Sequence, residues 1–365
     1  MRLGDCCKTN LHTYSDKEKW SLIRYLDTGS ITEGRIDEIQ TLYPGVDKIP
    51  SRARRKASVG DILFSTVRPN QKHYGIIEAG TENLLVSTGF TVVTVDTTIA
   101  DPYFIYYYLT QSSVIESLQA IAEQSTSTYP SIKPSDIEDI ELDLPELETQ
   151  KKIGSTLRML DRKIALNEEI NDNLQQQAQA IYSSMFIDNP DPAWSHGHLS
   201  DLITVKYGKD HKKLADGIYP VYGSGGIMRY VERPLYNKES VLIPRKGTLN
   251  NVMYVNQPFW SVDTMFYTEM KLPNVAKFVY HFVKAKDLAS MNAGSAVPSM
   301  TTDILNAMEV VIPSASALEE FESLVAPMYE AMEANDVQSK ALSQMRDTLL
   351  PKLMSGAIDV SDVQL

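Results

Sequence analysis

Apolar residues recur at alternating steps of four and three along two stretches of the chain, residues 150–186 and 318–354. That spacing places them on one face of an α-helix and matches the heptad pattern of a two-stranded coiled coil. The predicted seam consists of Ile153, Leu157, Leu160, Ile164, Asn167, Leu174 and Ile181 in the first stretch, and of Phe321, Val325, Met328, Met332, Asn335, Leu342 and Leu349 in the second. The pattern therefore predicts two long helices that pair through these faces.

The two stretches are copies of one sequence pattern. Residues 129–187 align without a gap on residues 297–355, so that Pro130 falls on Pro298 and the apolar seam keeps its register. Self-similarity at a fixed offset indicates a duplicated architecture. We therefore expect a pseudo-twofold internal repeat.

The segments that precede the helices, residues 1–145 and 191–313, have the texture of globular heads. Runs of β-branched and aromatic residues predict strands at 61–67, 74–77, 90–95, 241–243, 252–255 and 265–267. One further helix is expected in each head, at 102–118 and 276–289. The tyrosines of the 103–108 run are expected to lie in the core. The predicted fold is α+β, with two mixed α/β heads joined by helical segments at 146–190 and 314–357 and followed by a tail at 358–365.

Both seams contain an asparagine at the same level, Asn167 and Asn335. A buried polar pair in a coiled coil fixes the register and orientation of the helices. Antiparallel pairing agrees with the chain path, because the first helix leads from the first head to the second and the second helix can then return. An ordinary amphipathic helix packed on each head is the alternative. Gly356 is expected to cap the second helix, and Pro327 to kink its first turns.

The net charge of −12 argues against a nucleic-acid partner, but its distribution changes that picture. Residues 1–80 carry 13 Lys/Arg against 10 Asp/Glu, residues 197–253 carry 9 against 5, and the rest of the chain has a net charge of −19. Random fluctuation of surface charge is one interpretation. The other is that each head has a basic footprint, as a protein that binds the phosphate backbone at two places requires.

Several functional classes find no support in the sequence. The only cysteines are the adjacent Cys6 and Cys7, and no apolar run reaches the ~20 residues of a membrane span, so we expect a cytoplasmic protein without a membrane partner. Residues 223–226 are not followed by the Gly-Lys-Ser/Thr of a phosphate-binding loop. Residues 189–192 lack the aromatic of an adenine-methylation motif, and the six histidines are not at metal-ligand spacing. We predict a chain that is not itself an enzyme and has no catalytic or metal-binding residues.

Six blocks resemble the specificity subunit of type I restriction–modification systems, and together they span nearly the whole chain. They are residues 60–69 (Gly-Asp-Ile-Leu-Phe-Ser-Thr-Val-Arg-Pro), 222–227 (Tyr-Gly-Ser-Gly-Gly-Ile), 244–248 (Pro-Arg-Lys-Gly-Thr), 258–264 (Pro-Phe-Trp-Ser-Val-Asp-Thr), 144–153 and 345–356. Two places depart from the family pattern, Leu249-Asn250-Asn251 directly after the block at 244–248 and the serine–alanine run at 314–317. The first departure bears on what the second head reads.

The resemblance implies two target-recognition domains, each of which reads one half of a bipartite double-stranded DNA target. It also implies helices that set the spacer between the halves and dock two adenine methyltransferase subunits, with motor–nuclease subunits completing the complex. The specificity subunit itself would hold no cofactor, while S-adenosylmethionine, ATP and Mg²⁺ would belong to the partner subunits. A subunit of a methylation-only system, or a relative with a fused nuclease, stays open on this resemblance.

Basic and amide side chains near strand–turn junctions are the candidates for contacting DNA, because arginine and lysine reach guanine edges and asparagine reaches adenine. The candidates are Arg52, Arg54, Arg55, Lys56, Arg68, Asn70 and Lys72 in the first head, and Lys206, Tyr207, Lys209, Lys212, Lys213, Arg245, Lys246 and Asn250 in the second. Each of them has the alternative role of a solvated or structural residue. For the chain as a whole, a two-headed coiled-coil scaffold that binds protein is the competing hypothesis.

Overall fold

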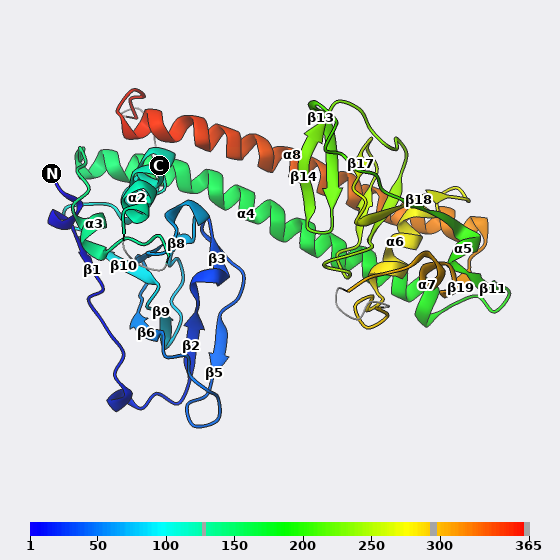
Figure 1. The fold of residues 1–365 in the computed structure, drawn as a ribbon, viewed down its shortest axis with the longest axis horizontal. Coiled ribbons are helices and arrows are strands. Elements are labelled where there is room, and N and C mark those ends of the chain that lie inside the picture. Colours follow the sequence, from blue (N-terminus) through cyan, green and yellow to red (C-terminus); the bar gives the residue numbers. More distant parts are fainter. Residues whose placement is uncertain (126–128, 293–297, 361–365) are drawn as a thin grey trace. The chain divides into compact units, whose positions relative to one another are not determined.

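The computed structural model describes residues 1–125, 129–292 and 298–360 (Figure 1). The end of the expected tail, residues 361–365, and the first residue of the second repeat copy, Val297, lie outside the described residues. The chain divides into two compact units, residues 1–166 with 337–365 and residues 167–336. The division falls inside both long helices, so each unit contains one head and part of each helix.

Each head is built on a four-stranded antiparallel sheet. In the first head the sheet order is β1 (Cys7–Thr9), β10 (Phe90–Val95), β7 (Ile62–Ser65) and β8 (Tyr74–Ile76). In the second head it is β12 (Ile203–Tyr207), β18 (Met265–Met270), β15 (Ser240–Pro244) and β16 (Met253–Val255). From one edge of the sheet to the other, both heads have the first, fourth, second and third of these strands, counted along the chain. All six predicted strands are confirmed.

The central strands of these sheets are apolar on both faces because both faces are covered. In β7, Ile62 and Phe64 belong to the core shared with the helices, whereas Leu63 belongs to the core shared with the second sheet of the head. In β15, Ile243 and Leu242 divide in the same way between two cores. Strands buried on both sides are expected to have continuous apolar runs, which is why these segments were recognisable.

A second sheet packs behind the first in each head, and here the heads differ. The first head has the order β5 (Gln40–Leu42), β2 (Ile23–Leu26), β9 (Leu84–Ser87) and β6 (Ala53–Lys56). The second head has the order β14 (Gly226–Val231), β13 (Asp216–Gly223) and β17 (Trp260–Ser261). Both contain one parallel pair, β2 with β9 and β13 with β17. The strand β6 has no counterpart in the second head's sheet. Two short ladders complete the strands, β3 (Ile31–Thr32) with β4 (Arg35–Ile36) and β11 (Ser195–His198) with β19 (Glu309–Ile312).

The helix expected at 102–118 is two helices, so that prediction was wrong in its extent. Helix α1 (Pro102–Leu109) starts at Asp101, whose side chain accepts a hydrogen bond from the N–H of Phe104, and α2 (Ser112–Glu123) follows. Gln111 has extended backbone angles, φ −61° and ψ 139°, which cannot continue a helix. Tyr106 and Tyr107 are buried in the core, as predicted.

In the second head, α6 (Ala276–Lys284) is shorter than the expected 276–289. Three short helices, α3 (Pro134–Glu138), α5 (Leu199–Leu202) and α7 (Thr302–Asn306), complete the heads.

The two long helices are α4 (Leu147–Ser183), which ends in a five-residue π-helical turn, and α8 (Ala315–Met354). Every predicted seam residue is buried or half-buried. Helix α8 continues through Pro327 without interruption. The expected cap at its end is confirmed, because Gly356 has φ +70° and its N–H donates to the carbonyl of Leu353.

Within each unit the contacts between α4 and α8 run in opposite chain directions. In the first unit, the beginning of α4 (Ile153 and Leu157) shares a core with the end of α8 (Leu353), and Arg346 Nη1 donates to Asp161 Oδ1 at 2.7 Å. In the second unit, the end of α4 shares a core with the beginning of α8. There Asn335 Nδ2 donates to Asn171 Oδ1 at 2.8 Å.

Candidate nucleic-acid interface

Both heads present an arginine at the same corner of the repeated sheet. Arg68 follows β7 and has the left-handed backbone angle φ 49°, while its N–H donates to the carbonyl of Pro130 at 3.0 Å. Arg245 follows β15, and its carbonyl accepts from the N–H of Met300 at 2.9 Å. The repeated Pro-Ser segment thus holds the strand end in each head. The fixed backbone sets the direction in which each guanidinium leaves the sheet.

Each of these guanidinium groups lies over a tyrosine ring. The Arg68 group is 5.3 Å from the ring centroid of Tyr129, and the Arg245 group is 5.3 Å from that of Tyr207. Arg245 also donates through Nη1 to the carbonyl of Asp263 at 3.1 Å. Neither arginine forms an ion pair with a described residue, so its positive charge stays uncompensated. An arginine positioned by an aromatic ring and not neutralised is suited to contact phosphate or a base edge.

Strand β6 of the first head and the residue before it provide four of the predicted cationic residues, in two different environments. Arg52, just before the strand, is exposed, whereas Arg54, Arg55 and Lys56 are half-buried. Burial lowers the pKa of Arg55, and its Nη1 makes no hydrogen bond to the described residues. Lys56 pairs with Glu18 at 2.5 Å and lies 5.1 Å from the ring centroid of Trp20. Arg52 is therefore the member of this group most accessible to DNA.

The remaining candidates of the first head lie on the turn that follows β7. Asn70 is exposed, and its backbone N–H donates to Gln119 Oε1 at 3.2 Å. Lys72 is exposed but forms an ion pair with Glu33. An exposed ion pair contributes little to stability, so Lys72 can exchange this carboxylate for a phosphate.

In the second head, three exposed lysines lie in the segment after β12, namely Lys209, Lys212 and Lys213. Lys206, on β12 itself, is 3.6 Å from Glu269 of the neighbouring strand, and Tyr207 is exposed. Together with Lys206, the three exposed lysines are four of the nine Lys/Arg between residues 197 and 253.

The loop after β15 contains the two other candidates of the second head. Lys246 is exposed. Asn250 has a structural role, because it donates to Asp287 Oδ1 at 3.1 Å and accepts from the N–H of Ala289 at 3.0 Å. Both hydrogen-bonding ends of its amide are thus used, and this residue is the weakest of the predicted contacts. The neighbouring Asn251 donates to the carbonyl of Ser224 at 2.8 Å and ties the loop to the tip of the β13–β14 hairpin.

Sequence reasoning missed the large apolar side chains that the second sheets expose. On β14, Met228 is 61% exposed and Tyr230 is 42% exposed. In the first head, Tyr43 and Val46 lie 52% and 85% exposed on the loop between β5 and β6. The signal available in the sequence was that each pair lies beside a glycine-containing turn, at Gly225-Gly226 and at Gly45.

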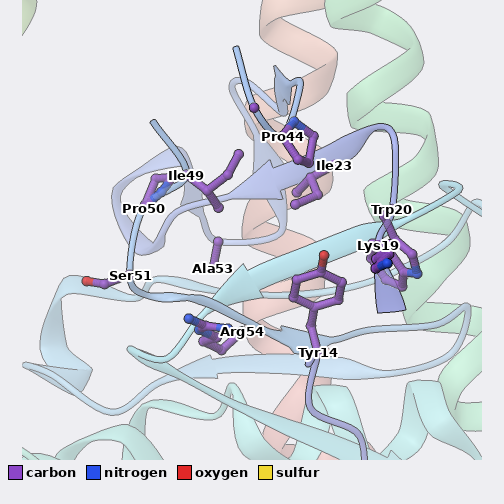
Figure 2. Close-up of a pocket in the computed structure, with 11 residues that line it drawn as sticks. Tyr14, Lys19, Trp20, Ile23, Pro44, Ile49, Pro50, Ser51, Ala53 and Arg54 are labelled. Carbon is purple, nitrogen blue, oxygen red and sulfur yellow. The ribbon is translucent and has the colours of Figure 1, made fainter. Parts of the chain in front are cut away.

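A cavity of about 470 Å³ lies beside β6 in the first head (Figure 2). Its walls combine aromatic, aliphatic and proline side chains, with a lysine and an arginine at the rim. The residues that line it are Tyr14, Lys19, Trp20, Ile23, Pro44, Gly45, Ile49, Pro50, Ser51, Ala53 and Arg54. Figure 2 shows the hydroxyl of Tyr14 pointing toward Ile23, between the Arg54 side and the Trp20 side. The size and lining are typical of a site for a small, largely apolar group.

The described residues contain no cluster of three or more histidine, cysteine, aspartate or glutamate side chains that could hold a metal ion. Among the same residues, no helix is long and apolar enough to cross a membrane. Cys6 and Cys7 are buried, and the pKa of the Cys7 thiol is raised by its hydrogen bond with Cys6 and by burial. The same hydrogen bond lowers the pKa of the Cys6 thiol.

Comparison with known proteins places both heads in one family. The family model described as "Type I restriction modification DNA specificity domain" matches residues 48–176 and again residues 193–321. The chain is 22% identical to the type I restriction enzyme HindI specificity subunit of Haemophilus influenzae, with 98% of each protein covered. It is 23% identical to the MjaIX specificity subunit of Methanocaldococcus jannaschii, over 83% of this chain and 79% of that protein. Its fold is similar to the crystal structure of a type I S subunit from M. genitalium, with a TM-score of 0.61, 18% identity and coverage of 97% of this chain and 95% of that one.

Proposed function

The chain belongs to the type I restriction–modification DNA specificity family, and from this premise we propose that it is the subunit that recognises the DNA target. Each head reads one half of a bipartite double-stranded sequence. The chain is not itself a catalyst in this proposal. Methylation and cleavage belong to two adenine methyltransferase subunits and to motor–nuclease subunits, which bind the S-adenosylmethionine, ATP and Mg²⁺.

The observation that carries the proposal is the repeated corner. Both heads use the same strand order, and both place an arginine over a tyrosine ring after the same strand, at Arg68 and Arg245. Two equivalent cationic corners on the shared sheet, combined with dissimilar second sheets, suit two half-sites of different sequence. In this arrangement the corner contacts the phosphate backbone and sets the register, while the second sheet reads bases.

We further propose that α4 and α8 form an antiparallel coiled coil that sets the spacer. The contacts of Asp161 with Arg346 in one unit and of Asn171 with Asn335 in the other support this pairing. A helix of 37 residues is roughly 55 Å long at ~1.5 Å per residue. That length matches about 16 base pairs at ~3.4 Å each, which is the scale of a bipartite target. The exposed outer faces of the same helices are the proposed docking surface for the methyltransferase subunits.

DNA binding at two salt concentrations tests the proposed function. Fluorescence anisotropy with a random duplex should give an affinity that falls steeply between about 50 and 200 mM salt, because bound phosphates release counterions. Methylome sequencing of cells that express the chain with its methyltransferase should then give one bipartite motif. A chain that binds no duplex at low salt, or an affinity that does not change with salt, would support a protein-binding scaffold instead.

A further inference from the structure

The loop between β5 and β6 exposes an apolar tip that is held in one conformation. Val46 is 85% exposed and Tyr43 is 52% exposed. The carbonyl of Tyr43 accepts from the N–H groups of Val46 and Asp47, at 3.0 and 2.8 Å, and the Tyr43 N–H donates to Asp47 Oδ2 at 2.8 Å. Gly45 allows the turn with φ +91°. These hydrogen bonds fix the turn and hold the apolar side chain of Val46 at its tip. The side chain is therefore positioned to insert into an apolar space of a binding partner.

The same loop forms one wall of the cavity, so the exposed tip and the cavity are adjacent. Pro44 and Gly45, the residues between the two exposed side chains, line the cavity directly. Opposite them stand two aromatic rings, Tyr14 and Trp20, with centroids 4.7 Å apart. Two apolar residues that line the cavity, Ile23 and Ala53, are each only 1% exposed and so belong to the core beneath it.

The polar groups around the cavity suit a planar base that carries a phosphate. Lys19 and Arg54 line the rim, and the exposed Arg52 lies two residues before Arg54. The Tyr14 hydroxyl points into the cavity (Figure 2). Aromatic walls stack on any base, and the cations match the phosphate on either side of it.

We propose that the first head extrudes one base of its half-site, and this inference rests on the proposed function. Val46, supported by Tyr43, enters the base stack as an apolar wedge, and the cavity beside Tyr14 and Trp20 holds the displaced base. Both parts have known physical counterparts, since apolar wedges unstack base steps and enzymes that act on a base hold it in an aromatic pocket. The strand and loop that build this site, β6 and residues 43–52, have no counterpart in the sheet of the second head. Base extrusion is therefore assigned to the first half-site alone.

An abasic-site scan of the bipartite target, once that target is known, tests the proposal. A set of duplexes carries one abasic position each, opposite every base of both half-sites, and binding is measured with the full complex of the chain and its methyltransferase. Losing the pairing partner lowers the free energy of extrusion, so at one position of the first half-site the affinity should rise roughly 10-fold or more. A 2-aminopurine placed at that position should become brighter when the complex binds.

Variants distinguish extrusion of a base into this cavity from extrusion by the methyltransferase subunits. Val46→Ala and Trp20→Ala should each remove the gain at that position, whereas Val59→Ala, which truncates a 58% exposed valine of the same head away from the cavity, should keep it. Extrusion by the methyltransferase subunits would instead give a gain in both half-sites that persists in the Val46 and Trp20 variants. Because Val46 is a surface residue, its variant folds even if the Trp20 variant does not.

Three results would overturn the inference while leaving the proposed function intact. They are a gain at no position of the first half-site, a gain that survives Val46→Ala, and loss of methyltransferase binding by Val46→Ala in the absence of DNA. The last result would make the loop tip a protein interface. A complex that shows no salt-dependent binding to any duplex would be a failure of the proposed function itself, and the two failures are thus distinguishable.

Discussion

The two heads share one sheet and differ in the other. The four-stranded sheets have the same strand order and the same buried central strands, whereas the second sheets differ in strand number, in loop length and in the cavity beside β6. The shared sheet is the one that contacts the helices, and the variable one lies on its other face. The sheet that packs on the helices can therefore stay the same while the second sheet changes with the half-site.

The attachment of each head to the long helices shows the same contrast. In the first unit Tyr107 of α1 donates to Asp161 of α4 at 2.7 Å, and Asp161 also accepts from Arg346 of α8. In the second unit His281 of α6 takes the central place, with Nδ1 at 2.8 Å from Gln179 Oε1 and Nε2 at 2.9 Å from Tyr329 Oη. One polar residue thus connects a head helix, α4 and α8 in each unit. The chemistry differs, so the two attachments should respond differently to pH.

The largest expected effect comes from exchanging a whole head. Replacing residues 191–313 with the matching segment of a relative should change one half of the methylated motif and keep the other half. The affinity for the original target should fall by roughly 10³-fold or more, because each mismatched base pair costs about 1–3 kcal/mol. Methylome sequencing reads the outcome, and a folded chimera that loses both halves would contradict the separation of the heads.

Each long helix contacts a head through a residue at the same position of the repeat. Truncating that residue should destabilise only the unit that contains it. Phe321 and Ile153 occupy equivalent repeat positions and are 0% and 3% exposed. We expect Phe321→Ala to lower the free energy of unfolding by about 3–5 kcal/mol and Ile153→Ala by about 2–4 kcal/mol. Hydrogen exchange should show each loss confined to its own unit. Equal loss of protection in both units would mean that the chain unfolds as one body.

The pH dependence of stability should differ between the units because of His281. Burial lowers the pKa of His281 to about 4, below the ~6.5 of an unfolded histidine. The unfolded state then binds the proton more tightly, so this contribution is complete above pH 6.5 and is lost as the pH falls toward 4. The second unit should lose about 2 kcal/mol between pH 7 and pH 5. His281→Gln, which does not titrate, should flatten the difference in urea unfolding followed at the two pH values; an unchanged pH dependence would exclude His281 as its source.

The smallest expected effects come from the exposed lysines of the second head. Lys213→Ala and Lys246→Ala should each reduce the slope of log affinity against log salt by about one and weaken binding to all sequences alike. Lys284→Ala, at the exposed end of α6 and outside the candidate interface, serves as the control. A changed motif without a changed slope would show that these lysines read bases.

The sequence predicted the frame well for a physical reason. Strands such as 90–95 and helices such as 318–354 follow from the spacing of apolar residues, which the local order of the sequence determines. The break at Gln111 was missed because no glycine or proline marks it in the sequence. The strand β6 was missed because Arg54, Arg55 and Lys56 are polar, so the pattern resembles a loop.

The candidate site was only partly predictable, since the partners of a side chain lie far away in sequence. Cationic residues could be listed, but the ion pair of Lys72 with Glu33 and the amide contacts of Asn250 depend on tertiary structure. The cavity combines residues 14 to 54 from three separate segments, and no short motif encodes it. Repetition was the stronger guide for the frame, because it predicted both long helices and their seams, whereas the equivalence of Arg68 and Arg245 follows from the structure.

In the proposed function a common helical frame separates two heads that read DNA independently, and a paired insertion into the two long helices tests this separation. Four residues are inserted after Leu166 and four after Asp336, the points at which each helix passes from one unit to the other. Each helix becomes ~6 Å longer, and the contacts within each unit are preserved. If the helices set the spacer, the methylated motif keeps both half-sites and its spacer becomes longer by about one to two base pairs. A folded, methylating variant with an unchanged spacer would contradict it.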